Sequence, residues 1–294
     1  MMKKINDIIG DAKTIGIAGH VRPDGDCMGS CMSLYNYLKK NRPDLDVRVF
    51  LEFVDKKFNI IENTDQIITT GYDGTKFDLF ISLDTASLDR LGLNLPFYEN
   101  AKRTACIDHH ASNDGYADYN YILPKASSAS EVLYDLLDED LIDKSIAEPM
   151  YMGIAHDSGV FRFQSTTPKT MRIAANMIEK GVNVNMILEE TFFRKTYNQM
   201  MVTAKIQSEA VLALDGKCIY GYCTSEMMEE YGVTTKDLDA VVASIRNVDG
   251  VEVAMFLYQL SEDSYKVSLR SKNYVDVSKI AVENGGGGHV RAAG

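Results

Sequence analysis

The chain has 294 residues, 45% of them hydrophobic and 25% charged, a globular balance and a length that suits one large or two ordinary domains. Its net charge of −11, with no Lys and Arg run longer than a pair, disfavours binding to long nucleic-acid duplexes and leaves short phosphorylated ligands open. We expect no membrane partner, because no stretch approaches the roughly 20 apolar residues that span a bilayer and no signal-peptide core follows the first lysines. Five scattered cysteines without a C-x-x-C pair predict reduced thiols in a cytoplasmic protein.

The first half of the chain predicts a parallel α/β domain. Short apolar runs predict strands at residues 14–19, 47–53, 77–83 and 103–107, and helical spacing of apolar residues predicts helices at 27–40, 130–137, 146–156 and 168–180. The runs at 77–83 and 103–107 are almost continuously apolar rather than alternating. Strands of this kind are buried on both faces, so we expect a mainly parallel sheet with helices on both sides.

The pattern changes after residue 183. Residues 183–212 are rich in helix signals, and later strands are expected at 217–223, 251–259 and 265–270, with helices at 226–231 and 236–247. The last two strands are joined by a short polar turn, which predicts an antiparallel hairpin. We therefore expect an α/β protein with a catalytic domain at residues 1–194, a helical linker at 195–212 and a smaller α/β domain with a mixed sheet at 213–294.

Three of the predicted strands of the first half run directly into Asp or His. Residues 14–19 lead to His20-Val-Arg-Pro-Asp24-Gly-Asp26, residues 77–83 lead to Asp84, and residues 103–107 lead to Asp108-His109-His110. In a parallel α/β sheet the carboxyl ends of the strands form the edge where ligands bind. A fourth site, Asp157, follows a predicted helix and can turn toward the same edge.

Clustered carboxylates repel one another unless cations neutralise them, and divalent metal ions are the usual solution. Carboxylates mixed with one or two imidazoles suit manganese or magnesium. Two such ions, about 3.5–4 Å apart, activate a water molecule and stabilise the attacking and leaving oxygens of a phosphate ester. The sequence therefore favours a two-metal phosphoesterase.

The ordered motifs resemble those of a known family. The residues His20-x-x-Pro23-Asp24-x-Asp26, Asp84, Asp108-His109-His110 and Asp157-Ser-Gly159 are similar to the motifs of the DHH phosphoesterases, and the C-terminal Gly286-Gly-Gly-His289-x-x-Ala-Ala-Gly294 is similar to the signature of the DHH-associated domain. The resemblance covers almost the whole chain and is greatest to the bacterial nanoRNase and pAp phosphatase type. We expect related proteins to continue with a further short segment after this signature.

The resemblance implies a role for each matching residue. His20 and Asp24 would bind one metal ion, Asp26, His109 and Asp157 the other, and Asp84 would bridge the two. Asp108 would orient the ligand histidine next to it, and His110 would face the scissile phosphate. A substrate phosphate would contact a second set of residues, namely Arg270, Gly286, Gly287, Gly288, His289 and Arg291. His156, and Cys27 with Cys31 on one helix face, are interpreted as packing residues.

The function implied by this resemblance is manganese-dependent hydrolysis of very short RNA (nanoRNA) to mononucleotides and of 3′-phosphoadenosine 5′-phosphate (pAp) to AMP, through attack of a metal-activated water on phosphorus, with magnesium as the second choice of ion. One alternative is a phosphodiesterase for linear or cyclic dinucleotide second messengers, with pApA and pGpG as linear substrates. Another is a non-catalytic nucleotide-binding sensor. A related inorganic pyrophosphatase would lack the Gly-Gly-Gly-His signature. A homodimer is one option for the assembly.

Overall fold

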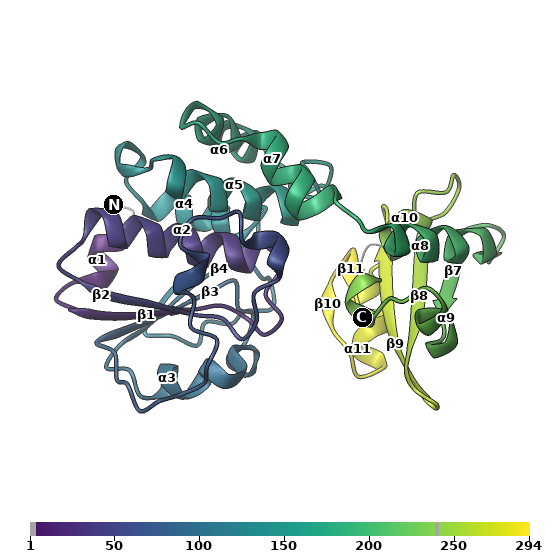
Figure 1. The fold of residues 1–294 in the computed structure, drawn as a ribbon, viewed down its shortest axis with the longest axis horizontal. Helices are drawn as coiled ribbons and strands as arrows, with labels where there is room; N and C mark the ends of the chain where they lie inside the picture. The colour runs from purple at the N-terminus through teal and green to yellow at the C-terminus, as the bar shows by residue number, and fades with distance from the viewer. Residues whose placement is uncertain (1–3, 239–240) are drawn as a thin grey trace. The chain divides into compact units, whose positions relative to one another are not determined.

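The computed structural model describes residues 4–238 and 241–294. The chain divides into two compact units, Met1–Arg194 and Lys195–Gly294, each with its own hydrophobic core (Figure 1). The α/β class expected from the sequence is confirmed in both units.

The first unit is built on a five-stranded sheet in which all strands are parallel. In the order β2-β1-β3-β4-β5, its strands are β1 (Thr14–Ala18), β2 (Asp46–Phe50), β3 (Leu79–Leu83), β4 (Thr104–Asp108) and β5 (Tyr119–Ile122). The sequence did not predict β5, because this edge strand is only partly buried and lacks the continuous apolar run of β3 and β4.

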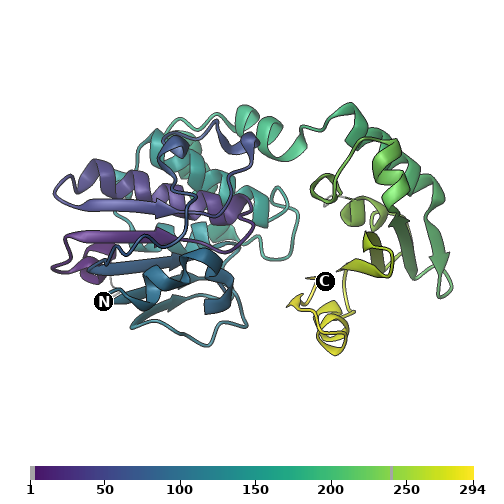
Figure 2. The ribbon, with the colours of Figure 1, turned by 60° about the horizontal axis from the view of Figure 1, so that its bottom comes forward.

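Helices cover both faces of this sheet, as predicted. They are α1 (Ile5–Ile9), α2 (Gly25–Asn41), α3 (Leu95–Glu99), α4 (Ala129–Leu136), α5 (Lys144–Asp157), α6 (Pro168–Glu179) and α7 (Val184–Leu188). Shorter 3-10 turns are η1 (Lys56–Phe58), η2 (Thr64–Gln66), η3 (Leu88–Asn94) and η4 (Glu139–Leu141), and the segment η5 (Glu189–Phe193) is a π-helix. The long helix α2 lies along one face of the sheet and α3 on the opposite face (Figures 1 and 2). On the α3 side the core is aromatic, with Phe50, Phe77, Phe80 and Phe97 in contact.

The second unit has a six-stranded mixed sheet, in the order β10-β11-β9-β8-β7-β6. Its strands are β6 (Val211–Ala213), β7 (Cys218–Cys223), β8 (Val253–Ser261), β9 (Ser264–Ser271), β10 (Gly288–His289) and β11 (Ala292–Ala293). Among the strands that the structure describes in this unit, only β7 and β8 pair in parallel, and the predicted β8–β9 hairpin is antiparallel.

The helices of the second unit are α8 (Tyr197–Glu209), α9 (Ser225–Glu230), the 3-10 turn η6 (Thr235–Asp237), α10 (Val241–Ile245) and α11 (Val277–Glu283). The helix expected over residues 236–247 corresponds to η6 and α10, and residues 239–240 of that range lie outside the described part. Helix α8, in the range expected to be a linker, packs Val202 and Ile206 into the core of the second unit.

No described helix is both long and apolar enough to cross a membrane.

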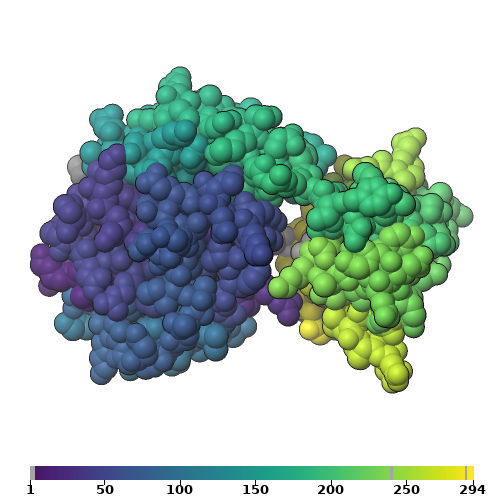
Figure 3. Space-filling model, viewed as in Figure 1, coloured from purple at the N-terminus to yellow at the C-terminus, as the bar shows by residue number. Residues whose placement is uncertain are grey.

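In the space-filling view, α6 and α7 contribute to the outer surface of the first unit (Figure 3). The predicted metal-binding residues belong instead to the start of α2, the end of α5 and the carboxyl ends of β1, β3 and β4.

The contact between α2 and α5 depends on a glycine. A Cβ atom at Gly29 would lie 2.4 Å from the carbonyl oxygen of Pro149 and 2.8 Å from the amide nitrogen of Gly153. Because both neighbours are backbone atoms, they cannot move aside as a side chain does. Gly29 therefore allows the two helices that flank the metal-binding motifs to approach closely.

We predict that Gly29→Ala lowers the free energy of unfolding of the first unit by about 1–3 kcal/mol, the usual cost of overpacking a tight interior. The matched control is Gly71→Ala, where an added Cβ would have no neighbour closer than 3.6 Å, so a change within about 0.5 kcal/mol is expected. Urea unfolding followed by circular dichroism measures both. Equal stability of the two variants would contradict the close α2–α5 contact.

Candidate metal centre

The metal-centre residues gather at one edge of the first sheet. His20 follows β1, Asp84 follows β3, and His109 follows β4, and these three parallel strands are neighbours in the order β1-β3-β4. Because all three run in the same direction, their carboxyl ends meet at one edge. The convergence expected from the sequence is therefore present in the structure.

Asp84 lies at the centre of this group. Its Oδ2 is 3.5 Å from Nε2 of His20, and its Oδ1 is 3.4 Å from Nε2 of His109 and 3.7 Å from Nδ1 of His110. The side chain is only 3% exposed, yet Oδ1 has no hydrogen-bond partner of good geometry among the described residues. A buried carboxylate oxygen in this state is costly without a cation, so the donor set fits a metal ion.

The backbone of Asp84 is also unusual. Its φ of 51° lies in the left-handed region, which side-chain-bearing residues rarely adopt. Strain of this kind is stored mainly at functional sites, where the surrounding structure enforces it. Here it directs the carboxylate into the cluster of imidazoles.

His20 is held in an orientation suited to metal binding. Its Nδ1 lies 2.8 Å from the carbonyl oxygen of Val21 and donates to it, which leaves Nε2 facing Asp84. Asp24, the N-cap of α2, lies farther out, with its Oδ1 3.8 Å from the same Nε2. The Asp24 side chain is 60% exposed, so this side of the centre opens to solvent.

A second donor group is formed by Asp26, His109 and Asp157, whose ligand atoms lie within 4.8 Å of one another. Nε2 of His109 is 3.9 Å from Oδ2 of Asp26 and 3.3 Å from Oδ2 of Asp157. Asp157 is the last residue of α5, where the sequence placed it. His109 contacts Asp84 as well, so the two groups adjoin at Asp84.

Asp26 is anchored by a helix that the sequence did not connect to the site. The backbone N–H groups of Ala129 and Ser130, at the start of α4, donate to its two carboxylate oxygens at 2.5 and 3.0 Å. A helix N-terminus stabilises an anion through such unpaired N–H groups. No motif spacing links residues 26 and 129, so only the folded chain reveals this contact.

The charges of the centre are strongly coupled. Burial would lower the pKa of His20, but Cys27 and the contacts with Asp24 and Asp84 outweigh it and raise the pKa well above the usual range. Burial likewise opposes protonation of His109, but Asp84 and Asp157 raise its pKa. Without metal, both imidazoles are therefore cations that balance the carboxylates.

Asp26 differs from Asp84 in its ionisation. Burial raises the pKa of Asp26 to about 7, and the nearby Asp84 carboxylate adds to the shift. For Asp84, burial also favours the neutral acid, but the neighbouring His109 and His20 outweigh it and lower the pKa. Asp84 therefore stays ionised in the metal-free protein, whereas Asp26 titrates near neutrality.

The partner of Asp108 differs from the sequence-based expectation. Asp108 was expected to orient the neighbouring His109, but its Oδ1 hydrogen-bonds to Nδ1 of His110 at 2.8 Å. Residues i and i+2 leave the end of a strand on the same side, which explains the pairing of Asp108 with His110. The other oxygen, Oδ2, accepts a hydrogen bond from Nδ2 of Asn113 at 2.7 Å, a residue that the sequence did not single out.

His156 is packed between the start of α2 and η5. Its Nε2 lies 2.8 Å from Oγ1 of Thr191, and its ring makes an edge-to-face contact with Phe192. A Cβ atom at Gly25 would lie 2.1 Å from Cγ of this ring, so the glycine between Asp24 and Asp26 makes room for it. Burial lowers the pKa of His156 to about 4, so this imidazole is neutral.

The glycine run of the second unit is folded against its own neighbours. The N–H of Gly286 donates to the carbonyl oxygen of Ala281 at 2.8 Å, and Gly287 exchanges backbone hydrogen bonds with Gly294 at 3.0 and 2.9 Å. These two N–H groups, which the sequence assigned to a substrate phosphate, are therefore used within the protein. A Cβ at Gly286 would lie 2.4 Å from the oxygen of Gly294, so close approach of two backbones explains this glycine.

The remaining substrate-binding candidates lie in the same part of the second unit. Arg270 in β9 pairs with Ala292 in β11, and the register of β11 with β10 is Gly288 to Ala293 and His289 to Ala292. Nη1 of Arg291 donates to the carbonyl oxygen of Val275 at 2.7 Å, so this guanidinium braces a loop of its own unit. The side chain of His289 lies outside the described part of the structure.

Family models match both units. The model of the DHH family N-terminal domain matches residues 14–154, and the model of the DHHA1 domain matches residues 215–294. The first match contains every metal-centre candidate except Asp157, and the second contains the glycine run.

Relatives match along most of the chain. A protein of Thermus thermophilus, named bifunctional oligoribonuclease and PAP phosphatase NrnA, is 32% identical over 95% of this chain and 83% of its own length. A Bacillus subtilis protein of the same name is 27% identical over 96% of this chain and 88% of its own length.

Among solved structures, an exopolyphosphatase-related protein of Bacteroides fragilis superposes with a TM-score of 0.89 at 23% identity, covering 98% of this chain and 88% of that one. At this identity the likeness establishes the fold. The relative that is 32% identical and the two domain matches place the chain in a family. The chain belongs to the DHH family of metal-dependent phosphoesterases, with a DHHA1 domain after the DHH domain, and is a hydrolase.

Proposed function

We propose that this protein is a manganese-dependent phosphoesterase that hydrolyses very short oligoribonucleotides to mononucleotides and pAp to AMP. The observation that carries the proposal is the pair of adjoining donor groups that meet at Asp84, because two neighbouring cation positions suit hydrolysis of phosphate esters. The names of the Thermus and Bacillus relatives support the choice of substrates.

In this proposal His20 and Asp24 bind one manganese ion, Asp26, His109 and Asp157 bind the other, and Asp84 bridges them. Imidazole and carboxylate donors suit manganese or magnesium, and the unpaired Oδ1 of Asp84 supports a shared cation there. When bound, the ions supply an activated water and neutralise charge that develops on the phosphate. Asp26 and His109 are almost fully buried, so their donor atoms keep a fixed geometry.

His110 is proposed to contact the scissile phosphate. The hydrogen bond from its Nδ1 to Asp108 fixes the ring, and Asn113 in turn fixes Asp108. Burial raises the pKa of Asp108, but the hydrogen bond with His110 outweighs this effect and lowers it, so Asp108 is an anion that holds the His110 ring in place.

The DHHA1 unit is proposed to anchor a phosphate of the substrate through His289, Gly288 and Arg270. Gly288 and His289 lie in β10 and Arg270 lies in β9, and β11 pairs with both strands, so these residues belong to the same end of the strand order. Gly286 and Gly287 are proposed to shape this part of the sheet rather than to bind, because their N–H groups already pair with backbone carbonyl groups. Arg291 and Arg270 each donate to a backbone carbonyl group of their own unit, so Arg291 stays a candidate for phosphate binding on the same terms as Arg270.

We predict manganese-dependent release of mononucleotide from a diribonucleotide and of AMP from pAp. Asp84→Asn should lose bound manganese and reduce kcat/KM by roughly two to three orders of magnitude, because a neutral amide no longer balances the cations. The matched control is Asp89→Asn, an exposed carboxylate that follows the same strand. Metal content by mass spectrometry and product analysis by chromatography give both results.

The outcome of this assay separates the alternatives. Higher kcat/KM on pApA or pGpG than on pAp would favour a phosphodiesterase for linear dinucleotides, which uses the same centre. Binding of nucleotide without turnover on any of these substrates would favour a non-catalytic sensor and overturn the proposal.

We predict that manganese binding weakens more steeply as the pH falls below about 7. The pKa of Asp26 is raised from 3.8 to about 7, so below pH 7 the metal must displace one additional proton. In that range, log Kd for manganese should rise by about one further unit for each unit by which the pH falls. In the metal-free protein, the raised pKa of Asp26 adds to the free energy of unfolding. This contribution is fully present below pH 3.8 and is lost as the pH rises through about 7. Manganese titrations followed by electron paramagnetic resonance at several pH values test the slope, and a constant slope would contradict the role of Asp26.

We predict that His289→Ala raises KM for pAp by roughly tenfold or more, the size of a lost hydrogen bond to a charged group. The manganese content should not change, because the proposed metal ligands all belong to the other unit. Val290→Ala, at the exposed neighbouring residue, is the control. Loss of manganese from the His289 variant would argue against an anchoring role.

A further inference from the structure

The inference concerns Asn113, a residue of the loop between β4 and β5. Its side chain is buried, and its backbone N–H donates to the carbonyl oxygen of His110 at 3.2 Å. From this place the side-chain amide contacts two parts of the metal centre that lie far apart in the chain, namely the backbone after Asp84 and the carboxylate of Asp108.

The orientation of this amide follows from its neighbours. Oδ1 of Asn113 accepts the backbone N–H of Gly115 at 2.9 Å, so Nδ2 faces the other side. There Nδ2 donates to Oδ2 of Asp108 at 2.7 Å and to the carbonyl oxygen of Thr85 at 3.1 Å, with a weaker contact of 3.4 Å to the sulfur of Cys106. The two N–H bonds of the amide are matched by the two oxygen acceptors. One side chain therefore ties the end of β3 to the end of β4.

Thr85 is the residue that follows the strained backbone of Asp84. Its Oγ1 donates to the carbonyl oxygen of Leu83 at 2.9 Å, which fixes the turn from the strand side. Its carbonyl oxygen accepts hydrogen bonds from Asn113 and, at 2.8 Å, from the hydroxyl of Tyr116, which fixes the turn from the loop side. A left-handed backbone at a residue with a side chain persists only where the surrounding contacts enforce it. These contacts on both sides of Asp84 account for its φ of 51°.

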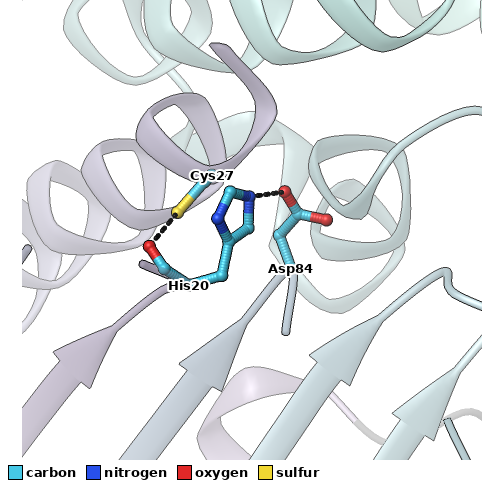
Figure 4. A group of neighbouring side chains, drawn as sticks. All are labelled: His20, Cys27 and Asp84. Atoms are coloured by element: carbon cyan, nitrogen blue, oxygen red, sulfur yellow. Dashed lines mark hydrogen bonds and ion pairs between the residues drawn. The ribbon is translucent and has the colours of Figure 1, made fainter. Parts of the chain in front are cut away.

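The turn held in this way sets the direction of the Asp84 carboxylate. Figure 4 shows this carboxylate at the end of its strand, directed toward the ring of His20, where its Oδ2 lies 3.5 Å from Nε2. The other acceptor of Asn113 is Asp108, whose Oδ1 is hydrogen-bonded to Nδ1 of His110 at 2.8 Å. The same amide therefore acts on a carboxylate of the donor groups and on the imidazole beside it.

We propose that Asn113 is a positioning residue that holds the Asp84 carboxylate and the His110 ring in a fixed relation, so that manganese binding and hydrolysis depend on one amide. This inference rests on the proposed function, in which Asp84 binds metal and His110 contacts the scissile phosphate. Tyr116 supports the Asp84 side alone, because its hydroxyl donates to Thr85 and makes no hydrogen bond to Asp108 among the described residues.

The test compares three variants of the full chain. Asn113→Ala removes both hydrogen bonds, and Tyr116→Phe removes the other donor to Thr85. The matched control is Asn120→Ala in β5, because Asn120 is exposed and its amide exchanges hydrogen bonds with the backbone of Ala117, at 2.6 and 3.1 Å, instead of contacting the metal centre. Urea unfolding followed by circular dichroism establishes that each variant is folded.

We expect Asn113→Ala to raise Kd for manganese by roughly tenfold or more, since groups behind metal ligands change affinity or activity by such factors. At saturating manganese it should also lower kcat for pAp by roughly tenfold or more, with KM changed by less than about threefold. Tyr116→Phe should raise Kd for manganese but lower kcat less than Asn113→Ala does, because the Asp108–His110 pair keeps its support. Asn120→Ala should stay within about twofold of the unmodified protein in all three quantities. Electron paramagnetic resonance of free manganese gives Kd, and initial rates give kcat and KM.

A double-mutant cycle distinguishes positioning from packing. In an Asp108→Ala background, Asn113→Ala should no longer lower kcat at saturating manganese, because the carboxylate through which it acts on His110 is already absent. Losses in kcat that simply add would show that Asn113 acts through packing and would overturn the inference.

The outcomes separate this inference from the proposed function. Asn113→Ala with the Kd and kcat of Asn120→Ala, or a change in only one of the two quantities, would overturn the role of Asn113 and leave the metal centre intact. Absence of manganese-dependent hydrolysis of pAp and of a diribonucleotide by the unmodified protein would overturn the proposed function itself. If Asn113→Ala does not fold, Asn113→Asp keeps the shape and the acceptor for Gly115 but lacks the N–H donors, and unchanged Kd and kcat in that variant would reject the inference.

Discussion

The carboxylate of Asp84, buried beside the imidazoles of His20, His109 and His110, is the interaction around which the first unit is organised. Moving an ionised carboxylate out of water costs several kcal/mol unless opposite charge compensates it. In the metal-free protein the protonated rings of His20 and His109 supply this charge, as the raised pKa values of both show. A divalent ion replaces those protons, so metal binding and proton release are coupled.

Several elements fix this centre without belonging to the donor groups. The N-terminus of α4 anchors Asp26, and Asn113 anchors Asp108, which orients His110. His156 occupies the space left by Gly25 and connects the start of α2 to η5 through Thr191. A catalytic constellation depends on such supporting contacts because small displacements of ligands and orienting groups reduce activity strongly.

The second unit uses its glycines differently from the first. Gly29 in α2 allows two helices to approach, whereas Gly286 allows the chain to pass close to Gly294 beside a short pair of strands. Part of the Gly-Gly-Gly-His signature therefore serves the fold, because Gly286 and Gly287 let this segment pack against Gly294. A binding role is proposed for Gly288 and His289, at the end of this signature, and for Arg270 in β9.

The amino-acid sequence by itself determined the class of both units, the parallel character of the first sheet, the β8–β9 hairpin and the family. These features follow from periodic burial and from motifs at strand ends, which are local signals in the chain. The tertiary structure decided the partner of Asp108, the anchoring of Asp26 by α4, the internal use of the Gly286 and Gly287 N–H groups, and the place of Cys27 beside His20. Each of these depends on where side chains and backbone segments meet in space, and packing between separate elements, rather than spacing along the chain, sets those meetings.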